Sequence, residues 1–202
     1  MRLAQRALAI AERENIIAGQ QQSWVNIGGL QQDSGDLDKA AASLERAVEL
    51  AKQMNNPLLV GRALQTASGV QRDLGNSAKA LEILLQALKY KTEGKATPSD
   101  FLNTYTAIGI LYTGQGALDV ALDYYRRAID GMNGEVTLGV AGVYNNIGLI
   151  QRARRQYNDA RKTYETALPI ARRFSNAGLE ATMLFNLSQI AWHEDELDKA
   201  ED

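Results

Sequence analysis

Few residues in this sequence could perform chemistry on a substrate. Its 202 residues include no Cys and one His, which excludes cysteine nucleophiles, disulfides, Cys zinc sites and multi-His metal sites. That residue, His193, precedes Glu194-Asp195-Glu196, but no second His follows one helical turn later, so we interpret the segment as a solvated turn. The segment Gly114-Gln115-Gly116 lacks the third glycine and the preceding strand of a phosphate-binding loop, and we interpret it as a turn between helices. We therefore predict no catalytic residues, no metal site, no cofactor and no enzymatic activity.

Asparagines recur at one position of a repeating pattern. Counting 14 residues back from the alanines described below gives the set Asn26, Thr66, Ala107, Asn146 and Asn186. Asn is a mediocre residue for a helix interior, so a property other than helix stability should favour it there. Its carboxamide can both donate to and accept from the backbone of a peptide. We predict that these asparagines contact a peptide backbone, together with the neighbouring Asn145. The alternative, hydrogen bonds between helices and no ligand, stays open.

A second position, eight residues before the same alanines, completes the predicted peptide-binding groove. It holds Gln32, Arg72, Thr113, Arg152 and Trp192. Arg72 and Arg152 would attract acidic side chains of a partner, and Trp192 would pack against apolar ones. We interpret the basic clusters at 152–155 and 172–173 as ordinary surface near helix C-termini, with contact to an acidic partner segment as the functional alternative.

An internal repeat positions these residues. Alanines at 40, 80, 121, 160 and 200 are spaced 40, 41, 39 and 40 residues apart. From Leu37 to Ala51, apolar residues recur at the spacing of one helical stripe, and similar stripes return around the later alanines. A second helix precedes each stripe, with small residues where two helices would cross closely: Gly28, Gly109 and Gly148. Each unit is thus a helix A, a tight turn, a helix B and a longer connection.

The pattern Trp24-x2-Ile27-Gly28-x6-Gly35-x4-Ala40-x3-Leu44-x2-Ala47 resembles a tetratricopeptide repeat. The resemblance covers nearly the whole chain, from about Gln21 to Asp202, in four full units and a truncated fifth. The period near 40 exceeds the consensus of about 34 residues, and is similar to the extended repeats of kinesin light chain and of bacterial signalling proteins. The resemblance implies an all-α, right-handed α-solenoid of antiparallel helix-turn-helix repeats, with a concave face that binds partners.

We predict about eleven helices in one array. Its parts are an orphan helix B at 1–19, repeats at 20–55, 56–96, 97–135 and 136–175, and a truncated repeat at 176–202. Abundant alanine and only three prolines favour helix throughout. Pro57 and Pro98 suit first helical turns, whereas Pro169 lies inside a helix B and should kink it or end it early. Asp195-Glu196 is expected to form the turn before the last helix B.

The charges nearly balance, with 22 Lys and Arg against 24 Asp and Glu, so the chain lacks the basic footprint of a nucleic-acid-binding protein. No apolar stretch approaches the ~20 residues that span a bilayer, and the N-terminus does not resemble a signal peptide. We expect no nucleic-acid or membrane partner and a cytoplasmic location.

The expected function is protein–protein interaction, with an extended peptide or a partner helix bound in the concave groove. The alternative is a sensor or regulatory segment of a larger signalling or transcription-regulating protein. A stacked array needs polar caps, and this sequence carries apolar stripes at both ends. We therefore interpret it as a piece of a longer array, and expect self-association through the uncapped terminal helices.

Overall fold

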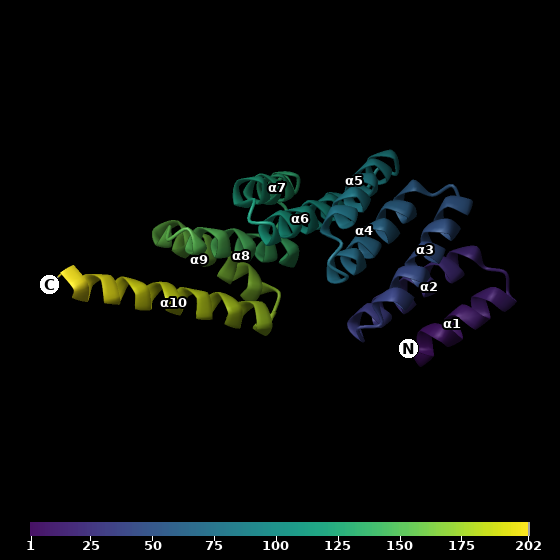
Figure 1. The fold of residues 1–202 in the computed structure, drawn as a ribbon, viewed down its shortest axis with the longest axis horizontal. Coiled ribbons are helices and arrows are strands. Elements are labelled where there is room, and N and C mark those ends of the chain that lie inside the picture. The colour runs from purple at the N-terminus through teal and green to yellow at the C-terminus, as the bar shows by residue number, and fades with distance from the viewer. Residues whose placement is uncertain (202) are drawn as a thin grey trace. The chain divides into compact units, whose positions relative to one another are not determined.

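The computed structural model describes the backbone of residues 1–201 and the side chains of residues 1–193. In this part of the chain the fold consists of ten α-helices (Figure 1), which confirms the predicted all-α class. The helices are α1 (Arg2–Arg13), α2 (Ile17–Asp33), α3 (Leu37–Gln53), α4 (Pro57–Asp73), α5 (Ser77–Glu93), α6 (Pro98–Gly114), α7 (Leu118–Asp130), α8 (Leu138–Ala153), α9 (Tyr157–Arg173) and α10 (Ala177–Glu201).

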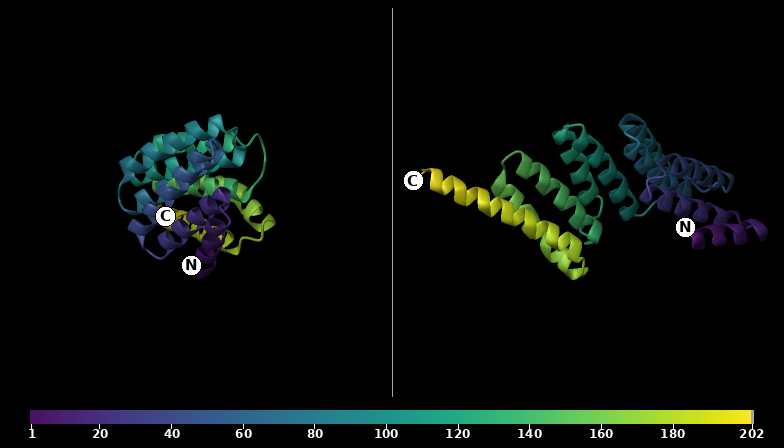
Figure 2. Two further views of the ribbon diagram at one scale, coloured as in Figure 1. Left: turned by 90° about the vertical axis from the view of Figure 1, so that its right-hand side faces the viewer. Right: turned by 60° about the horizontal axis from the view of Figure 1, so that its bottom comes forward.

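The chain divides into two compact units, Met1–Ala107 and Ile108–Asp202, with the boundary inside α6. In unit 1, each of the helices α1 to α4 packs against the next one in the sequence, and α2 also reaches α4. In unit 2, α7 packs on α8, α8 on α9, and α10 on both α8 and α9. Successive helices within each unit run in opposite directions, as the further views in Figure 2 show.

The recurring alanines lie at the closest helix contacts. Ala40, Ala80, Ala121 and Ala160 are all 0% exposed. The glycines on the preceding helices allow two helices to cross closely, as predicted. A methyl group on Gly28 would lie 2.7 Å from Leu44 Cγ, and one on Gly148 would lie 2.6 Å from the Tyr164 ring. Side chains at these positions would force the helices apart, so each glycine is matched to a large residue on its partner helix.

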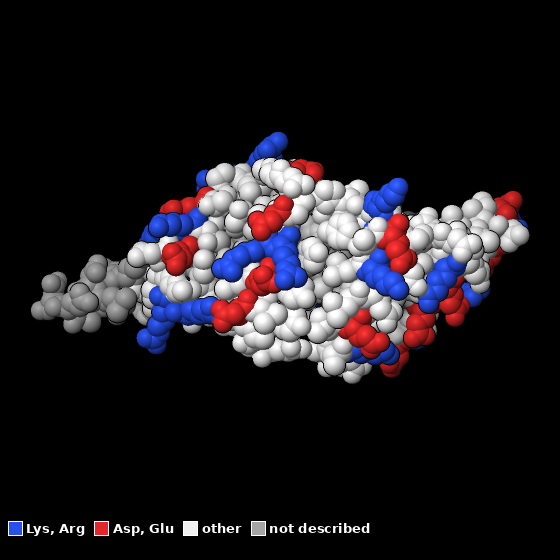
Figure 3. Space-filling view, turned by 90° about the horizontal axis from the view of Figure 1, so that it is seen from above, with Lys and Arg blue, Asp and Glu red and all other residues white. Residues whose placement is uncertain are grey.

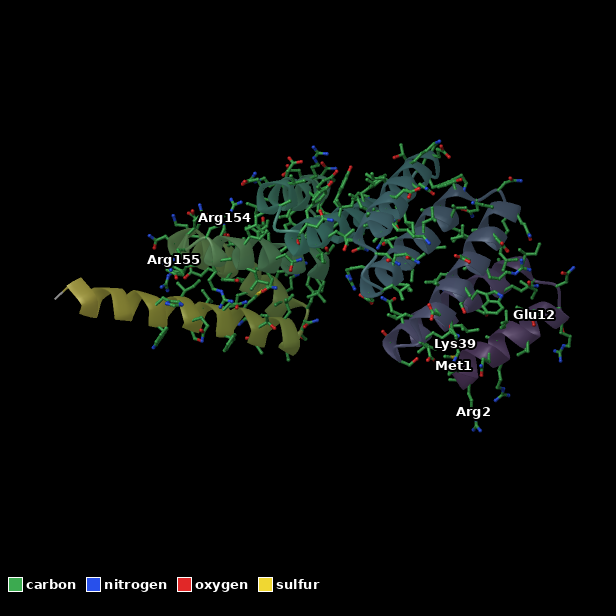
Figure 4. The ribbon with its side chains drawn as sticks, viewed as in Figure 1. Met1, Arg2, Glu12, Lys39, Arg154 and Arg155 are labelled. Carbon is green, nitrogen blue, oxygen red and sulfur yellow. The ribbon has the colours of Figure 1, made fainter. Side chains whose placement is uncertain are left out.

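Tight turns join helix A to helix B, and each uses one residue in the left-handed region. Gly35, Gly75 and Gly116 adopt φ values of 81°, 82° and 75° at the same repeat position. The fourth repeat has Arg155 there, with φ 59°. Figure 4 labels it beside Arg154 in the turn after α8. The segment around Gly114 is therefore a turn between α6 and α7, as expected.

The prolines divide into two kinds. Pro57 and Pro98 are the first residues of α4 and α6, as predicted, and Asn56 caps α4 by accepting a hydrogen bond from the Leu59 N–H at 3.1 Å. The expectation that Pro169 ends its helix early is wrong, because α9 continues to Arg173. Pro169 is exposed, while Ala167 and Ala171 on the packed face of α9 are 0% exposed, so packing holds the helix past the missing hydrogen bond.

The expected turn at Asp195-Glu196 is also wrong. Helix α10 continues without interruption from Ala177 to Glu201, so the described residues form ten helices and not eleven. In the preceding repeats the equivalent position holds Gly35, Gly75, Gly116 and Arg155 in the left-handed conformation, whereas Asp195 lies within the continuous helix. Asp202 lies outside the described residues.

Candidate functional site

Unit 1 contains a cavity of about 780 Å³, which we call the α1–α2 cavity. Its walls are the first two turns of α1, one face of α2 and Thr66 of α4. Apolar side chains of α1 and α2 supply most of the lining, and the polar side chains are those of Asn26, Asp33 and Thr66. Asn26 and Thr66 occupy the same repeat position, so the structure brings two copies of the predicted binding position to one cavity.

Asn26 is exposed in this cavity. Its Oδ1 accepts a hydrogen bond from Gln22 Nε2 at 3.1 Å, which leaves the NH₂ group as a donor for another molecule. The hydroxyl of Thr66, in contrast, donates to the Arg62 carbonyl in its own helix at 3.3 Å. Of the two side chains, Asn26 is therefore the one suited to contact a peptide backbone.

Arg72 lies outside the cavity and already has an acidic partner. Its Nη2 and Nε contact Asp73 Oδ1 at 2.8 and 3.0 Å, and Asp73 Oδ2 also accepts from Gln32 Nε2 at 2.6 Å. Partial burial would raise the pKa of Asp73, but the hydrogen bonds from Gln32 and Arg72 and the charge of Arg72 hold it below its usual value. The charge of Arg72 is thus largely neutralised within the repeat.

The asparagines of unit 2 have a different environment. Asn186 is 3% exposed, and its Nδ2 donates to Asn145 Oδ1 across α8 and α10 at 3.4 Å. Asn146 is half-buried on α8 beside this pair. The structure therefore places Asn145 and Asn186 in a hydrogen bond between helices, which is the alternative that the sequence left open.

Arg152 and Trp192 also lie in unit 2. Arg152 is half-buried, and its charge acts on the Tyr164 hydroxyl, whose pKa burial raises to about 12. Trp192 is 57% exposed and meets the His193 ring edge-on at 5.0 Å, while His193 stacks on Tyr157 at 5.3 Å. His193 is therefore part of an aromatic cluster. Among the described residues, no three His, Cys, Asp or Glu side chains converge as a metal site would require.

A buried lysine is the feature that the sequence did not reveal. Lys91 on α5 is 1% exposed, and its ammonium donates to the Asp100 carbonyl at 2.9 Å, to Thr104 Oγ1 at 2.7 Å and to Gln65 Oε1. A methyl group on Gly61 would lie 2.7 Å from Lys91 Cγ, so the glycine makes room for the lysine stem. Lys91 occupies the repeat position of Ala51 and Ala171, and that comparison was the available signal.

An ion pair borders this lysine. Arg62 Nε and Nη2 bind the two carboxylate oxygens of Asp100 at 2.8 and 3.0 Å, and Asp100 also accepts from Thr97 at the start of α6. The hydrogen bond from Arg62 is the main reason that the pKa of Asp100 falls to about 2. Burial lowers the pKa of Lys91 to about 8, against the favourable charge of Asp100. The cluster joins α4, α5 and the first turns of α6.

The face shown in Figure 3 has no dominant charge. On the face shown in Figure 3, Lys and Arg alternate with Asp and Glu along the part of the chain that is coloured. None of the helices that the structure describes combines the length and apolarity needed to cross a membrane.

Sequence comparison identifies the repeat. A tetratricopeptide repeat model matches residues 20–93 and 139–202, and a second tetratricopeptide repeat model matches residues 101–132. No curated protein sequence matches the chain.

Solved structures share the fold at low sequence identity. BtubC (BKLC) from P. vanneervenii has a TM-score of 0.81 and 22% identity, over 99% of this chain and 85% of that one. The TPR-like repeats of a putative kinesin light chain from Podosopora anserina have a TM-score of 0.68 and 13% identity, over 89% of each chain. A Rap protein complexed with Competence and Sporulation Factor has a TM-score of 0.64 and 18% identity, over 96% of this chain and 58% of that one. These similarities confirm the predicted class, an α-solenoid of helix-turn-helix repeats.

Proposed function

Because the chain belongs to the tetratricopeptide repeat family, we propose that it is a protein-interaction module that holds a segment of another polypeptide in the α1–α2 cavity. The proposal assigns it no reaction of its own. The observation that carries it is the exposed carboxamide of Asn26 in a cavity whose other walls are largely apolar. Such a combination suits a peptide or helix, since apolar side chains supply affinity and a few polar groups fix orientation.

The residues predicted from the sequence have different roles under this proposal. Asn26 contacts the ligand in unit 1. In unit 2, Asn146 and Arg152 are the residues we propose for contacts of the same kind. Asn145 and Asn186 serve mainly to join α8 to α10, because their side chains already bind each other. Arg72 has a lesser role, since Asp73 neutralises it.

A second candidate function is that of a regulatory segment in a larger signalling or transcription-regulating protein. The observation favouring it is the fold similarity to a Rap protein solved with Competence and Sporulation Factor. In this case the cavity would receive a signal molecule and transmit the binding to an effector domain. An output domain adjoining these repeats in the parent sequence would favour this candidate over a plain scaffold.

Site-specific cross-linking tests the main proposal. The photoreactive amino acid p-benzoylphenylalanine is placed at position 26, the protein is irradiated in extract of the source cells, and cross-linked peptides are identified by mass spectrometry. The same amino acid at position 39 is the control, because Lys39 is exposed on α3 and is not among the residues that line the cavity. We expect a polypeptide cross-linked at position 26 and not at position 39. Equal labelling at both positions, or none at position 26, would overturn the proposal.

A further inference from the structure

One repeat position carries the contact between successive A helices in unit 1. Gln32, on α2, lies against α4 at two residues. Its Nε2 donates to Asp73 Oδ2 at 2.6 Å, and a methyl group on Gly69 would lie 3.2 Å from the same nitrogen. The small Gly69 lets the glutamine side chain pass across the helix, and the carboxylate of Asp73 accepts a hydrogen bond from its amide.

Helix α2 has an equivalent glycine and aspartate one repeat earlier, but no glutamine from a preceding helix A packs against them. Gly29 and Asp33 occupy the repeat positions of Gly69 and Asp73, and both line the α1–α2 cavity. A methyl group on Gly29 would have no atom within 4 Å. The cavity therefore has the features with which α4 receives the side chain of Gln32, and it has room for a larger one.

Trp192 is the residue of this chain that fits those features. It occupies on α10 the repeat position that Gln32 has on α2, and it is 57% exposed. Its indole is a flat apolar body with one N–H donor, which suits a glycine surface beside a carboxylate. We propose that α10 of a second copy of this chain docks onto the α1–α2 cavity, with Trp192 over Gly29 and its N–H directed to Asp33.

A second repeat position supports the same docking. Where a helix A meets the helix B that follows it, the paired residues match in character. Ser43 donates to Gln31 Oε1 at 2.7 Å, Thr163 donates to Gln151 Oε1 at 2.8 Å, and the rings of Tyr112 and Tyr124 stack at 5.7 Å. At this position α10 has Ala191 and α1 has Leu3, both exposed and both apolar. Leu3 on α1 and Ala191 on α10 occupy the two sides of this pair without a helix partner of their own repeat, and they match each other in character.

The residues at the point where helix A and helix B cross most closely are also compatible with this docking. Gly28 meets Leu44 in the first repeat, and the same positions are Ser188 on α10 and Ala4 on α1. A serine opposite an alanine fits without a clash, since neither side chain is large. The exposed Leu184, at the repeat position of Trp24, adds apolar area on the same face of α10.

This inference rests on the proposed function, because it names the polypeptide that occupies the α1–α2 cavity. The contact is heterologous: the cavity of one copy receives the helix of another, so assembly continues beyond a dimer unless the rotation closes a ring. We therefore expect the average mass of the protein to rise with concentration.

Analytical ultracentrifugation of the 202-residue chain and three variants tests the proposal. Trp192→Ala removes the anchor, and Leu3→Lys places a charge at the cavity; each should weaken association at least about 30-fold, as expected for a central contact residue. Ala9→Lys adds the same charge to an exposed residue of α1 that does not line the cavity, and should associate like the parent. Circular dichroism checks that all variants remain helical.

Mixing the two defective variants gives the sharper result. Trp192→Ala retains an intact cavity and Leu3→Lys retains an intact α10, so an equimolar mixture should form a one-to-one dimer and nothing larger. A parent protein that stays monomeric, association that survives both substitutions, or a mixture that stays monomeric would each overturn the inference. A monomeric parent that still cross-links another protein at position 26 would overturn the inference and leave the proposed function standing.

Discussion

The hydroxyl groups of Tyr125 and Tyr164 occupy the same repeat position, but only that of Tyr125 has a hydrogen-bond partner. Tyr125 lies 3.2 Å from Thr113 Oγ1, whereas the buried Tyr164 hydroxyl has no partner in the structure. Burial raises the pKa of both phenols, and both stay neutral near neutral pH. The difference arises because the fourth repeat has Arg152 where the third has Thr113.

Removing the two hydroxyl groups should therefore have opposite effects. We expect Tyr164→Phe to raise the free energy of unfolding by about 1 kcal/mol, because it eliminates an unsatisfied buried group. Tyr125→Phe should lower it by about 1 kcal/mol, because it eliminates a hydrogen bond. Urea denaturation of the matched variants measures both values. A larger loss of stability for Tyr164→Phe than for Tyr125→Phe would show that the Tyr164 hydroxyl is satisfied in solution.

Lys91 should make the free energy of unfolding depend on pH in the alkaline range. Burial lowers its folded-state pKa to about 8 from 10.5, so the folded state bears a cost for the buried charge below pH 8. That cost disappears as the pH rises from 8 to 10.5, because the folded protein loses the proton before the unfolded chain does. Relative to Lys91→Met, the parent should gain about 2 kcal/mol between pH 7 and pH 9.5.

The comparison with Lys91→Met cancels the titration of the other lysines and tyrosines. In this variant Thr104 Oγ1 keeps its contacts with the Asp100 carbonyl and Gln65 Oε1, at 3.0 and 2.9 Å, so the fold should survive. Guanidinium denaturation of both proteins at pH 7 and pH 9.5 gives the difference in the free energy of unfolding between parent and variant. A difference independent of pH would mean that Lys91 is solvated in the folded protein.

The turn between α8 and α9 should gain from a glycine. Arg155 holds a left-handed conformation that costs a residue with a side chain about 1–2 kcal/mol, while glycine loses part of this gain through its greater freedom when unfolded. We expect Arg155→Gly to raise stability by about 0.5–1 kcal/mol in thermal denaturation. The control Arg154→Gly should bring no gain, since Arg154 has negative φ and its Nη1 binds Asp119 Oδ1 at 2.9 Å.

Asn26 and Asn186 should respond differently to alanine. Asn186→Ala removes the donor to Asn145 from a buried position, so we expect a loss of about 1–3 kcal/mol in the free energy of unfolding. Asn26→Ala should leave stability nearly unchanged and weaken ligand binding by about 0.5–1.5 kcal/mol. Chemical denaturation and a titration with the polypeptide found by cross-linking give the two readings. A strongly destabilised Asn26→Ala with unchanged affinity would leave only a structural role.

The repeat made most of the fold predictable. The period near 40 located the buried alanines, and the glycines followed from their distance to a large residue on the next helix. Pro169 was misjudged because local rules weigh the lost hydrogen bond, whereas the packing of Ala167 and Ala171 decides the outcome.

The candidate site was predictable only in part. Asn26 reaches a cavity, but nothing in the sequence showed that Asn186 and Asn145 would bind each other. Lys91 escaped notice because a lysine among apolar positions usually extends to solvent, and its partners come from two other helices, α4 and α6. Only the folded chain brings Gln65, Asp100 and Thr104 to one ammonium group.

The matched glycines and large side chains constrain how such a gene can be rearranged. Leu44 and Tyr164 each need the glycine on the helix before them, Gly28 and Gly148, to pass at close range. A crossover within a turn such as 34–36 would separate the members of a pair and could place a bulky residue opposite a bulky residue. A crossover in a longer connection such as 54–56 transfers both members together. Duplications and exchanges that survive in this chain's lineage should therefore have their breakpoints after a helix B.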